Sequence, residues 1–102
     1  MINSEKVKIL LEERIKLLPD EPKVNRIWEE LIEIFSKNKK ETNEYLAMAS
    51  RKQIEWISEV FEDISENLQS KEFISLLKEL EKKFSDLDLS VDILYAEKAL
   101  KK

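Results

Sequence analysis

Apolar residues recur at intervals of three and four positions along most of the chain, and no two-residue alternation persists for the length of a strand. This spacing predicts helices at about residues 4–18, 22–37, 42–49, 51–69 and 70–84, and a last one from about residue 90. The connections between them are short, so consecutive helices are expected to lie roughly antiparallel. The sequence therefore predicts one all-α domain over residues 1–102, a compact antiparallel bundle or a short stack of helical hairpins with five to six helices.

Capping residues and prolines mark the ends of these helices. Asn3 or Ser4 is expected to cap the first helix and Ser70 the fifth. The Pro-Asp-Glu-Pro segment at 19–22 ends the first helix, because proline disfavours helical geometry in the residue before it. The segment 50–53, Ser-Arg-Lys-Gln, has the form of a capping box and predicts the start of the clearest helix in the chain.

The apolar face of each helix predicts which side chains form the core. In the helix expected at 51–69 the apolar residues step by three, four, three and four positions, which is typical of a core-facing seam. This seam consists of Ile54, Ile57, Phe61, Ile64 and Leu68. The first helix is expected to place Val7, Leu10, Leu11, Ile15 and Leu18 on one side, and the short third helix carries Tyr45, Leu46 and Met48.

The two tryptophans occupy different positions relative to these faces. Trp28 lies on the apolar face of the second helix and is expected in the core. Trp56 lies at the edge of its apolar face, beside Glu55 and Glu59, where it could either seal the bundle or anchor a partner. The sealing role is the favoured interpretation.

Composition excludes most enzyme classes. The chain has no Gly, Cys or His among its 102 residues. Without Cys or His there is no disulfide, thiol nucleophile, zinc finger, haem ligand or Ser-His-Asp triad. Without Gly there is no phosphate-binding loop of the P-loop or dinucleotide type. The sequence therefore predicts a protein that is not an enzyme, with no catalytic residues, no metal and no cofactor.

Hydropathy bears on localisation. The longest apolar runs are four residues, at 46–49 and 93–96, which is too short for a signal peptide or a membrane-spanning helix. A hydrophobic content of 42% is enough to build a core, which argues against disorder. We therefore expect a folded cytoplasmic protein without a membrane partner.

The negative charge is concentrated in one segment. Residues 53–70 contain five acidic side chains and no Lys or Arg, whereas the formal charge of the whole chain is −4. At about 100° per residue, four of them fall within roughly 60° of one another, opposite the apolar seam. We call this set the acidic ridge: Glu55, Glu59, Glu62 and Glu66. It is either a solvated face neutralised by lysines of neighbouring helices, or a surface that meets a basic partner.

Other interpretations of the charged residues carry less weight. The carboxylate pairs of the ridge could chelate a divalent cation, but a di-iron bundle would also need histidine. Acid–base catalysis would need an apolar pocket that raises a carboxyl pKa, and these carboxylates are expected to face solvent. The lysines near 37–40 and 78–83 are too few to offset the negative charge, which argues against nucleic-acid binding.

The stretch 53–73, QIEWISEVFEDISENLQSKEF, continued by FSDLDL at 84–89, resembles small bacterial immunity proteins of contact-dependent growth inhibition and related polymorphic toxin systems. The resemblance is a pattern of helix-forming residues and contains no catalytic signature. It implies a cytoplasmic protein without enzymatic activity. Such a protein binds the toxin domain delivered by a neighbouring cell, often a nuclease, and blocks its active site or a nearby surface.

Charge and resemblance together predict a partner. A nuclease is basic where it holds the phosphate backbone, so an inhibitor with a run of carboxylates can occupy that site. The hypothesis is an immunity protein that binds the C-terminal domain of a cognate toxin. The candidate partner-binding residues are Glu55, Trp56, Glu59, Glu62, Asp63, Glu66, Asp86 and Asp88. The alternative is a helical adaptor or homodimeric regulatory module that binds through an apolar groove, and the sequence leaves the oligomeric state open.

Overall fold

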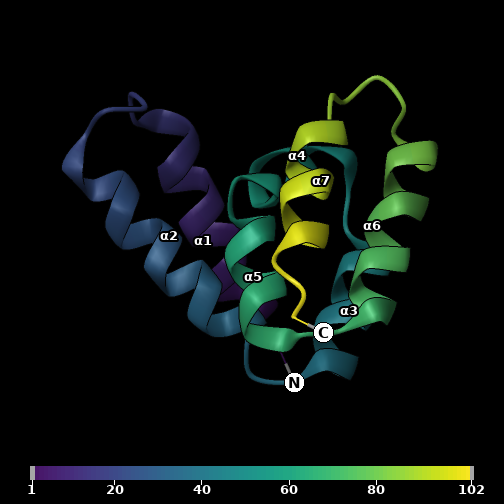
Figure 1. Ribbon diagram of the computed structural model, residues 1–102. Helices are drawn as coiled ribbons and strands as arrows, with labels where there is room; N and C mark the ends of the chain where they lie inside the picture. The colour runs from purple at the N-terminus through teal and green to yellow at the C-terminus, as the bar shows by residue number, and fades with distance from the viewer. Residues whose placement is uncertain (1, 102) are drawn as a thin grey trace.

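The computed structural model describes residues 2–101, which contain helices and no strand (Figure 1). The elements in chain order are α1 (Ser4–Lys16), α2 (Pro22–Phe35), α3 (Lys39–Met48), α4 (Arg51–Ile57), a 3₁₀ turn η1 (Ser58–Val60), α5 (Phe61–Leu68), α6 (Lys71–Lys83) and α7 (Ser90–Lys98). The elements α4, η1 and α5 follow one another directly and take the place of one predicted helix. The predicted all-α fold with five to six helices is therefore confirmed.

Side-chain caps explain where these helices begin. The side chains of four residues accept hydrogen bonds from backbone N–H groups in the first turn, as N-caps do. They are Asn3, Asn38, Ser50 and Ser70, with donor–acceptor distances of 3.1, 2.9, 3.2 and 3.1 Å. The Gln53 side chain accepts in return from the backbone N–H of Ser50 at 2.9 Å, so the predicted capping box is confirmed.

One predicted helix is interrupted. The sequence predicted an unbroken helix over 51–69, and this is wrong at 58–60, where the backbone tightens into η1. Within this turn the Ser58 hydroxyl donates to the carbonyl oxygen of Glu55 at 2.6 Å, and Val60 leaves helical geometry with φ −117° and ψ 13°. A side-chain bond of this kind competes with the regular backbone pattern. Glu59 lies inside the interruption.

Buried side chains from every α-helix meet in one cluster within the described chain. Phe61 and Phe73 meet edge to face with 6.3 Å between ring centroids, and all five residues of the predicted seam are buried. One predicted apolar position is wrong: Leu18 is 66% exposed because α1 ends at Lys16 and the backbone turns extended there. Met48 is 85% exposed because it lies about 200° around α3 from buried Leu46.

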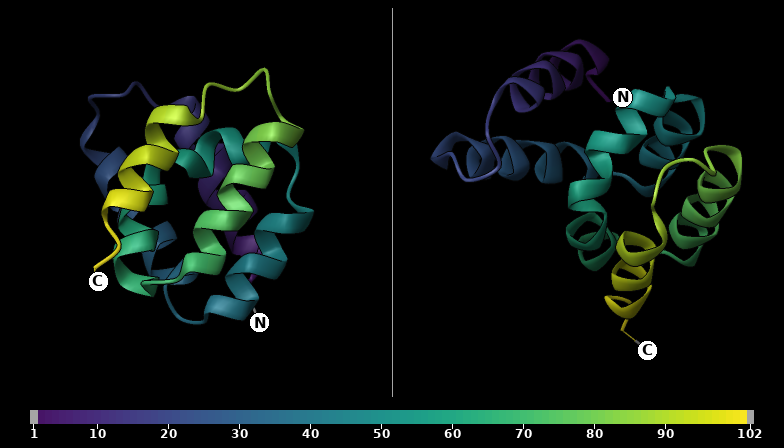
Figure 2. Two further views of the ribbon diagram at one scale, coloured as in Figure 1. Left: turned by 45° about the vertical axis from the view of Figure 1, so that its right-hand side comes forward. Right: turned by 90° about the horizontal axis from the view of Figure 1, so that it is seen from above.

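The last three helices bring distant parts of the chain together. α6 runs antiparallel to α5, and α7 returns beside α5 in the same direction as α5 (Figure 1, Figure 2). The Ser65 hydroxyl donates to the carbonyl oxygen of Ala96 at 2.5 Å. Farther along both helices, the Gln69 side chain donates to the carbonyl oxygen of Ala99 at 2.9 Å and accepts from the backbone N–H of Lys101 at 2.6 Å. These bonds fix which faces of α5 and α7 adjoin.

Gln69 also ends α5 in the left-handed conformation, with φ 48° and ψ 54°. Glycine usually occupies such a position, and a residue with a Cβ costs roughly 1 kcal/mol there. This chain has no glycine. The hydrogen bonds that the Gln69 side chain makes to the end of α7 offset that cost and keep α7 against α5.

No helix in the described residues is both long enough and apolar enough to cross a lipid bilayer.

Candidate protein-binding surface

The acidic ridge predicted from the sequence divides into two parts in the structure. A 3₁₀ turn advances about 120° per residue instead of 100°, so three residues of η1 rotate the start of α5 by roughly 60°. This rotation displaces Glu55, which precedes η1, from the line of the carboxylates on α5, and displaces Glu59, which lies inside η1, by less. What separates the two parts is their partners.

Glu59 is held by an arginine from a distant part of the sequence. The Arg14 guanidinium donates twice to the Glu59 carboxylate, with Nε–Oε1 2.8 Å and Nη2–Oε2 2.7 Å. The Trp28 indole N–H donates to the same carboxylate at 3.0 Å. The Arg14 side chain is 5% exposed and that of Glu59 is 26% exposed. A bidentate pair with this little solvent is a structural element, because a buried guanidinium needs its charge compensated.

The two tryptophans enclose this pair. The Arg14 guanidinium lies 5.0 Å from the ring centroid of Trp56 and 5.9 Å from that of Trp28. Both rings are half-buried and pack against the core. We call Arg14, Trp28, Trp56 and Glu59 the Arg14 network. Since it joins α1, α2, α4 and η1, Trp56 and Glu59 hold the fold together, which agrees with the sealing role favoured for Trp56.

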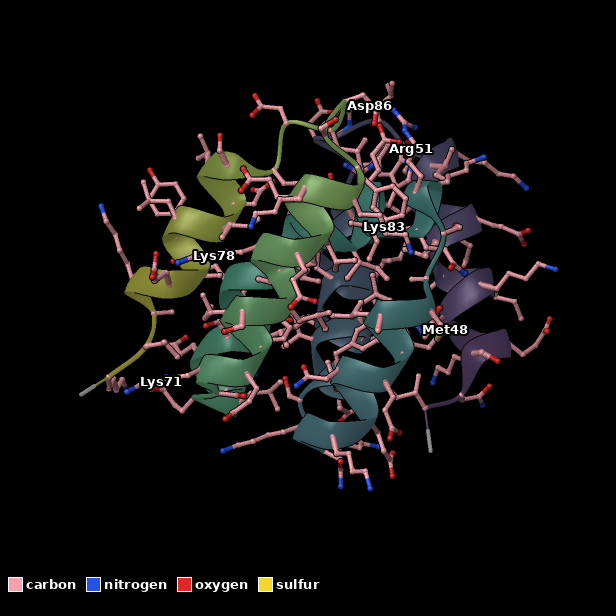
Figure 3. All side chains as sticks on the ribbon, turned by 90° about the vertical axis from the view of Figure 1, so that its right-hand side faces the viewer. Met48, Arg51, Lys71, Lys78, Lys83 and Asp86 are labelled. Carbon is pink, nitrogen blue, oxygen red and sulfur yellow. The ribbon has the colours of Figure 1, made fainter. Side chains whose placement is uncertain are left out.

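A second arginine engages two more of the candidate carboxylates. Arg51 donates through Nε to Asp86 Oδ2 at 2.6 Å, and its Nη1 lies 3.9 Å from Glu55 Oε1. Figure 3 shows Arg51 and Asp86 at the same end of the molecule. The hydrogen bond from Arg51 lowers the pKa of Asp86. The residues are solvent-exposed, so this cluster adds little stability. Asp88, also exposed, accepts from the Ser90 hydroxyl at 3.2 Å.

The remaining three candidates have no cationic partner among residues 2–101. Glu62, Asp63 and Glu66 are exposed on α5, and none of them forms an ion pair with another residue between 2 and 101. We call them the α5 carboxylates. Their helix contains no Lys or Arg, so like charges three and four positions apart repel one another.

The orientation of the α5 carboxylates follows from the contacts of their neighbours. Ser65 faces α7, through its bond to Ala96, whereas the Asn67 amide donates to the Ser36 hydroxyl after α2 at 2.9 Å. At about 100° per residue, Glu62 lies about 60° from Ser65 on the side of α5 next to α7, and Asp63 lies about 40° from Asn67 on the side toward α2. Glu66 lies between them, about 100° from each of Ser65 and Asn67.

Asp92, on the first turn of α7, belongs to the same region and was not among the residues predicted from the sequence. Its carboxyl is partly buried, and burial raises its pKa above the usual 3.8; the charges of Asp88 and Glu59 raise it further. It forms no ion pair within the described part of the chain. Its nearness to Glu59 depends on how α7 packs, and no local sequence signal reveals it.

The geometry limits the chemistry of this surface. The α5 carboxylates are open to solvent, and no three acidic side chains in residues 2–101 converge into a possible metal site. The surface is suited to contact with a positively charged macromolecule. No family model, curated protein or solved structure matches this chain, so the surface itself is the basis for assigning a function.

Proposed function

We propose that this chain is an immunity protein that binds and neutralises the C-terminal domain of a cognate toxin, a nuclease, in the cytoplasm of the cell that makes it. The observation that carries the proposal is the set of three α5 carboxylates, Glu62, Asp63 and Glu66, exposed and without a cationic partner among the described residues. The resemblance of 53–73 and 84–89 to immunity proteins supports the same function.

The charge chemistry fits inhibition of a nuclease. The phosphate-binding surface of a nuclease is basic, and carboxylates can occupy the places of phosphates without being cleaved. Unpaired negative charge raises the rate of encounter with such a surface and penalises acidic competitors. Glu55, Glu59, Trp56 and Asp86 are engaged within the protein, so the proposal assigns the main contact to α5.

The partner is tested by co-expression. The C-terminal domain of a large secreted protein encoded immediately upstream should arrest growth when expressed alone. It should co-purify with this chain, which should restore growth. A neighbouring domain that binds without being neutralised, or the lack of any such domain, would contradict the proposal. Concentration-dependent assembly of this chain alone would favour the alternative of an adaptor or homodimeric module.

The surface is tested by charge reversal. Glu62→Lys with Glu66→Lys should lower the association rate with that domain about tenfold or more at low salt, with a smaller difference at high salt. The matched control is Glu12→Lys with Glu13→Lys, the same change of charge at two exposed positions of α1. α1 lies on the far side of the molecule from α7 in Figure 2. Equal association rates for the two variants would remove α5 from the interface.

A further inference from the structure

The exposed apolar side chains of this protein gather on α7. Among residues 2–101, six large hydrophobic side chains are exposed, and three of them lie on this nine-residue helix. Val91 is 54% exposed, Leu94 46% and Tyr95 48%. Their spacing places them together on the side of α7 opposite buried Ile93 and Ala96. Single exposed apolar residues are ordinary, whereas a contiguous group points to an interface. We call these three residues the α7 face.

Different charges border the two long edges of the α7 face. On the α5 edge lie Glu62 and Glu66, which have no ion pair in the described structure, with partly buried Asp92 at the beginning of α7. On the α6 edge, Lys78 pairs with Glu97 at 3.1 Å, and Figure 3 shows Lys78 between the two helices. Among the described residues, no cation pairs with the carboxylates of the α5 edge, whereas Lys78 pairs with Glu97 on the α6 edge.

Cations of this chain also approach the α7 face, from the α6 side and at its C-terminal end. A groove of about 350 Å³ between α6 and α7 is lined by Lys78, Lys82, Glu81 and Leu94 among others. At the C-terminal end of α7 the Lys98 ammonium lies 5.9 Å from the centroid of the Tyr95 ring. A positively charged partner is therefore directed to the first two turns of α7 and to the α5 edge.

We infer that the α7 face and its acidic edge form a docking surface for a cationic amphipathic segment of a protein partner, whose apolar side chains cover Val91, Leu94 and Tyr95 while its Lys or Arg side chains meet Glu62, Glu66 and Asp92. Apolar contact supplies affinity, and the carboxylates supply orientation and encounter rate. The inference deepens the proposed function and rests on it for the charge of the partner.

Charge complementarity favours a cationic protein segment over a second copy of this chain. A cation placed beside Asp92 would offset the charges of Asp88 and Glu59 that act on the Asp92 carboxyl. A second copy of the chain would bring the same net charge of −4 and the same unpaired carboxylates. A protein segment with interleaved apolar and basic residues is complementary both to the α7 face and to the carboxylates at its edge.

The probe is a synthetic amphipathic helix of Leu and Lys, about 14 residues long so that it covers α7. It is titrated into the ¹⁵N-labelled full chain and followed by NMR. A second peptide with Ala in place of every Leu has the same charge. The Leu peptide should bind at least about tenfold more tightly than the Ala peptide, because only it covers the α7 face. The shifted amides should belong to α5 and α7.

The double variant Leu94→Ser with Tyr95→Ser tests the α7 face, and Met48→Ser is its control. The first pair should weaken binding of the Leu peptide about tenfold, and Met48→Ser should not change it, although Met48 is 85% exposed on α3. All three positions are solvent-exposed, so the variants should keep the thermal transition of the parent chain. Equal affinity for the two peptides, or shifts centred on α3, would overturn the inference.

Two further outcomes separate this inference from the proposed function. If the α7 amides shift with protein concentration in the absence of peptide, the occupant is a second copy and the inference is overturned. If the Leu94→Ser and Tyr95→Ser variant still neutralises the upstream toxin domain with unchanged affinity, the proposed function stands and the α7 face is not part of its interface.

Discussion

Two halves of one acidic segment behave differently. In α4 and η1, Glu55 and Glu59 each lie beside an arginine, and the Glu59 pair is held in two-point contact by a nearly buried Arg14. In α5, Glu62 and Glu66 have no cation within ion-pair distance in the described structure. Charge counted along the sequence does not distinguish these halves, because the decisive partner of Glu59 is 45 residues away.

Burial explains why the halves differ. A guanidinium as buried as that of Arg14 is tolerated only with its charge and its N–H groups compensated, so Glu59 is tied to it by the fold. The α5 carboxylates remain in water, where leaving them unpaired costs only a few tenths of a kcal/mol per neighbouring pair. Glu59 therefore stabilises the protein, whereas the α5 carboxylates are available to a partner.

The largest effect is expected from breaking the Arg14 network. Arg14→Ala leaves the Glu59 carboxylate partly buried without its cation, and should lower the free energy of unfolding by about 2–4 kcal/mol. Urea unfolding followed by tryptophan fluorescence measures this directly. Glu59→Gln should also be destabilising, because it leaves the nearly buried Arg14 guanidinium without a counter-charge, although the amide oxygen can still accept from Trp28. An Arg14→Ala midpoint equal to that of the parent chain would show that the network is not structural.

The fold was largely predictable because its signals are local. Each of four helix starts is signalled by a residue at or beside the first turn: Asn3, Ser50 and Ser70 as caps, and Pro22. The seam of 51–69 follows from the spacing of its apolar residues alone. The break at Ser58–Val60 was not predictable from periodicity, because the apolar seam continues across it.

The candidate surface was predictable only in part. The sequence identified Glu62, Asp63 and Glu66, but it could not separate them from Glu59, since the pairing with Arg14 depends on how α1 packs against α4 and η1. Asp92 and the α7 face were missed for a related reason. Their significance comes from α7 lying beside α5, a long-range contact fixed by hydrogen bonds such as Ser65 to Ala96.

A smaller change in the free energy of unfolding, of opposite sign to that of Arg14→Ala, is expected when α5 is given a cation of its own. Glu66→Lys places a lysine four positions after Glu62, in the favourable order for a helix, and should raise the free energy of unfolding by about 0.3–0.5 kcal/mol. The same change should slow association with the toxin domain by about threefold to tenfold at low salt. Denaturant unfolding and stopped-flow association measure the two effects. A variant that is stabilised yet associates at the parent rate would contradict the proposed role of α5.

The smallest effect is expected at Asp92. Its pKa is raised in the folded protein, so ionisation opposes folding, and the stability present when the carboxyl is protonated is lost as the pH rises through the folded pKa. Asp92→Asn should therefore stabilise the protein at pH 7 by up to about 0.5 kcal/mol, since solvent screening keeps the effect small.

The pH dependence provides the control for Asp92. The gain from Asp92→Asn should fade as the pH falls toward and below 3.8, the usual pKa, because the parent carboxyl is then protonated. Denaturant unfolding at pH 7 and pH 3 tests this. Loss of stability at pH 7 would show that the favourable position of the Asp92 carboxylate in the first turn of α7 outweighs its burial and the charges of Asp88 and Glu59.

The most direct test of the division between the two halves is the amide hydrogen-exchange footprint of this chain bound to the upstream toxin domain. Slower exchange on binding is predicted across α5 and α7, with α4 unchanged. Protection of α4 and η1 that leaves α5 and α7 unchanged would contradict the account, because it would place the partner on the carboxylates that the fold already holds.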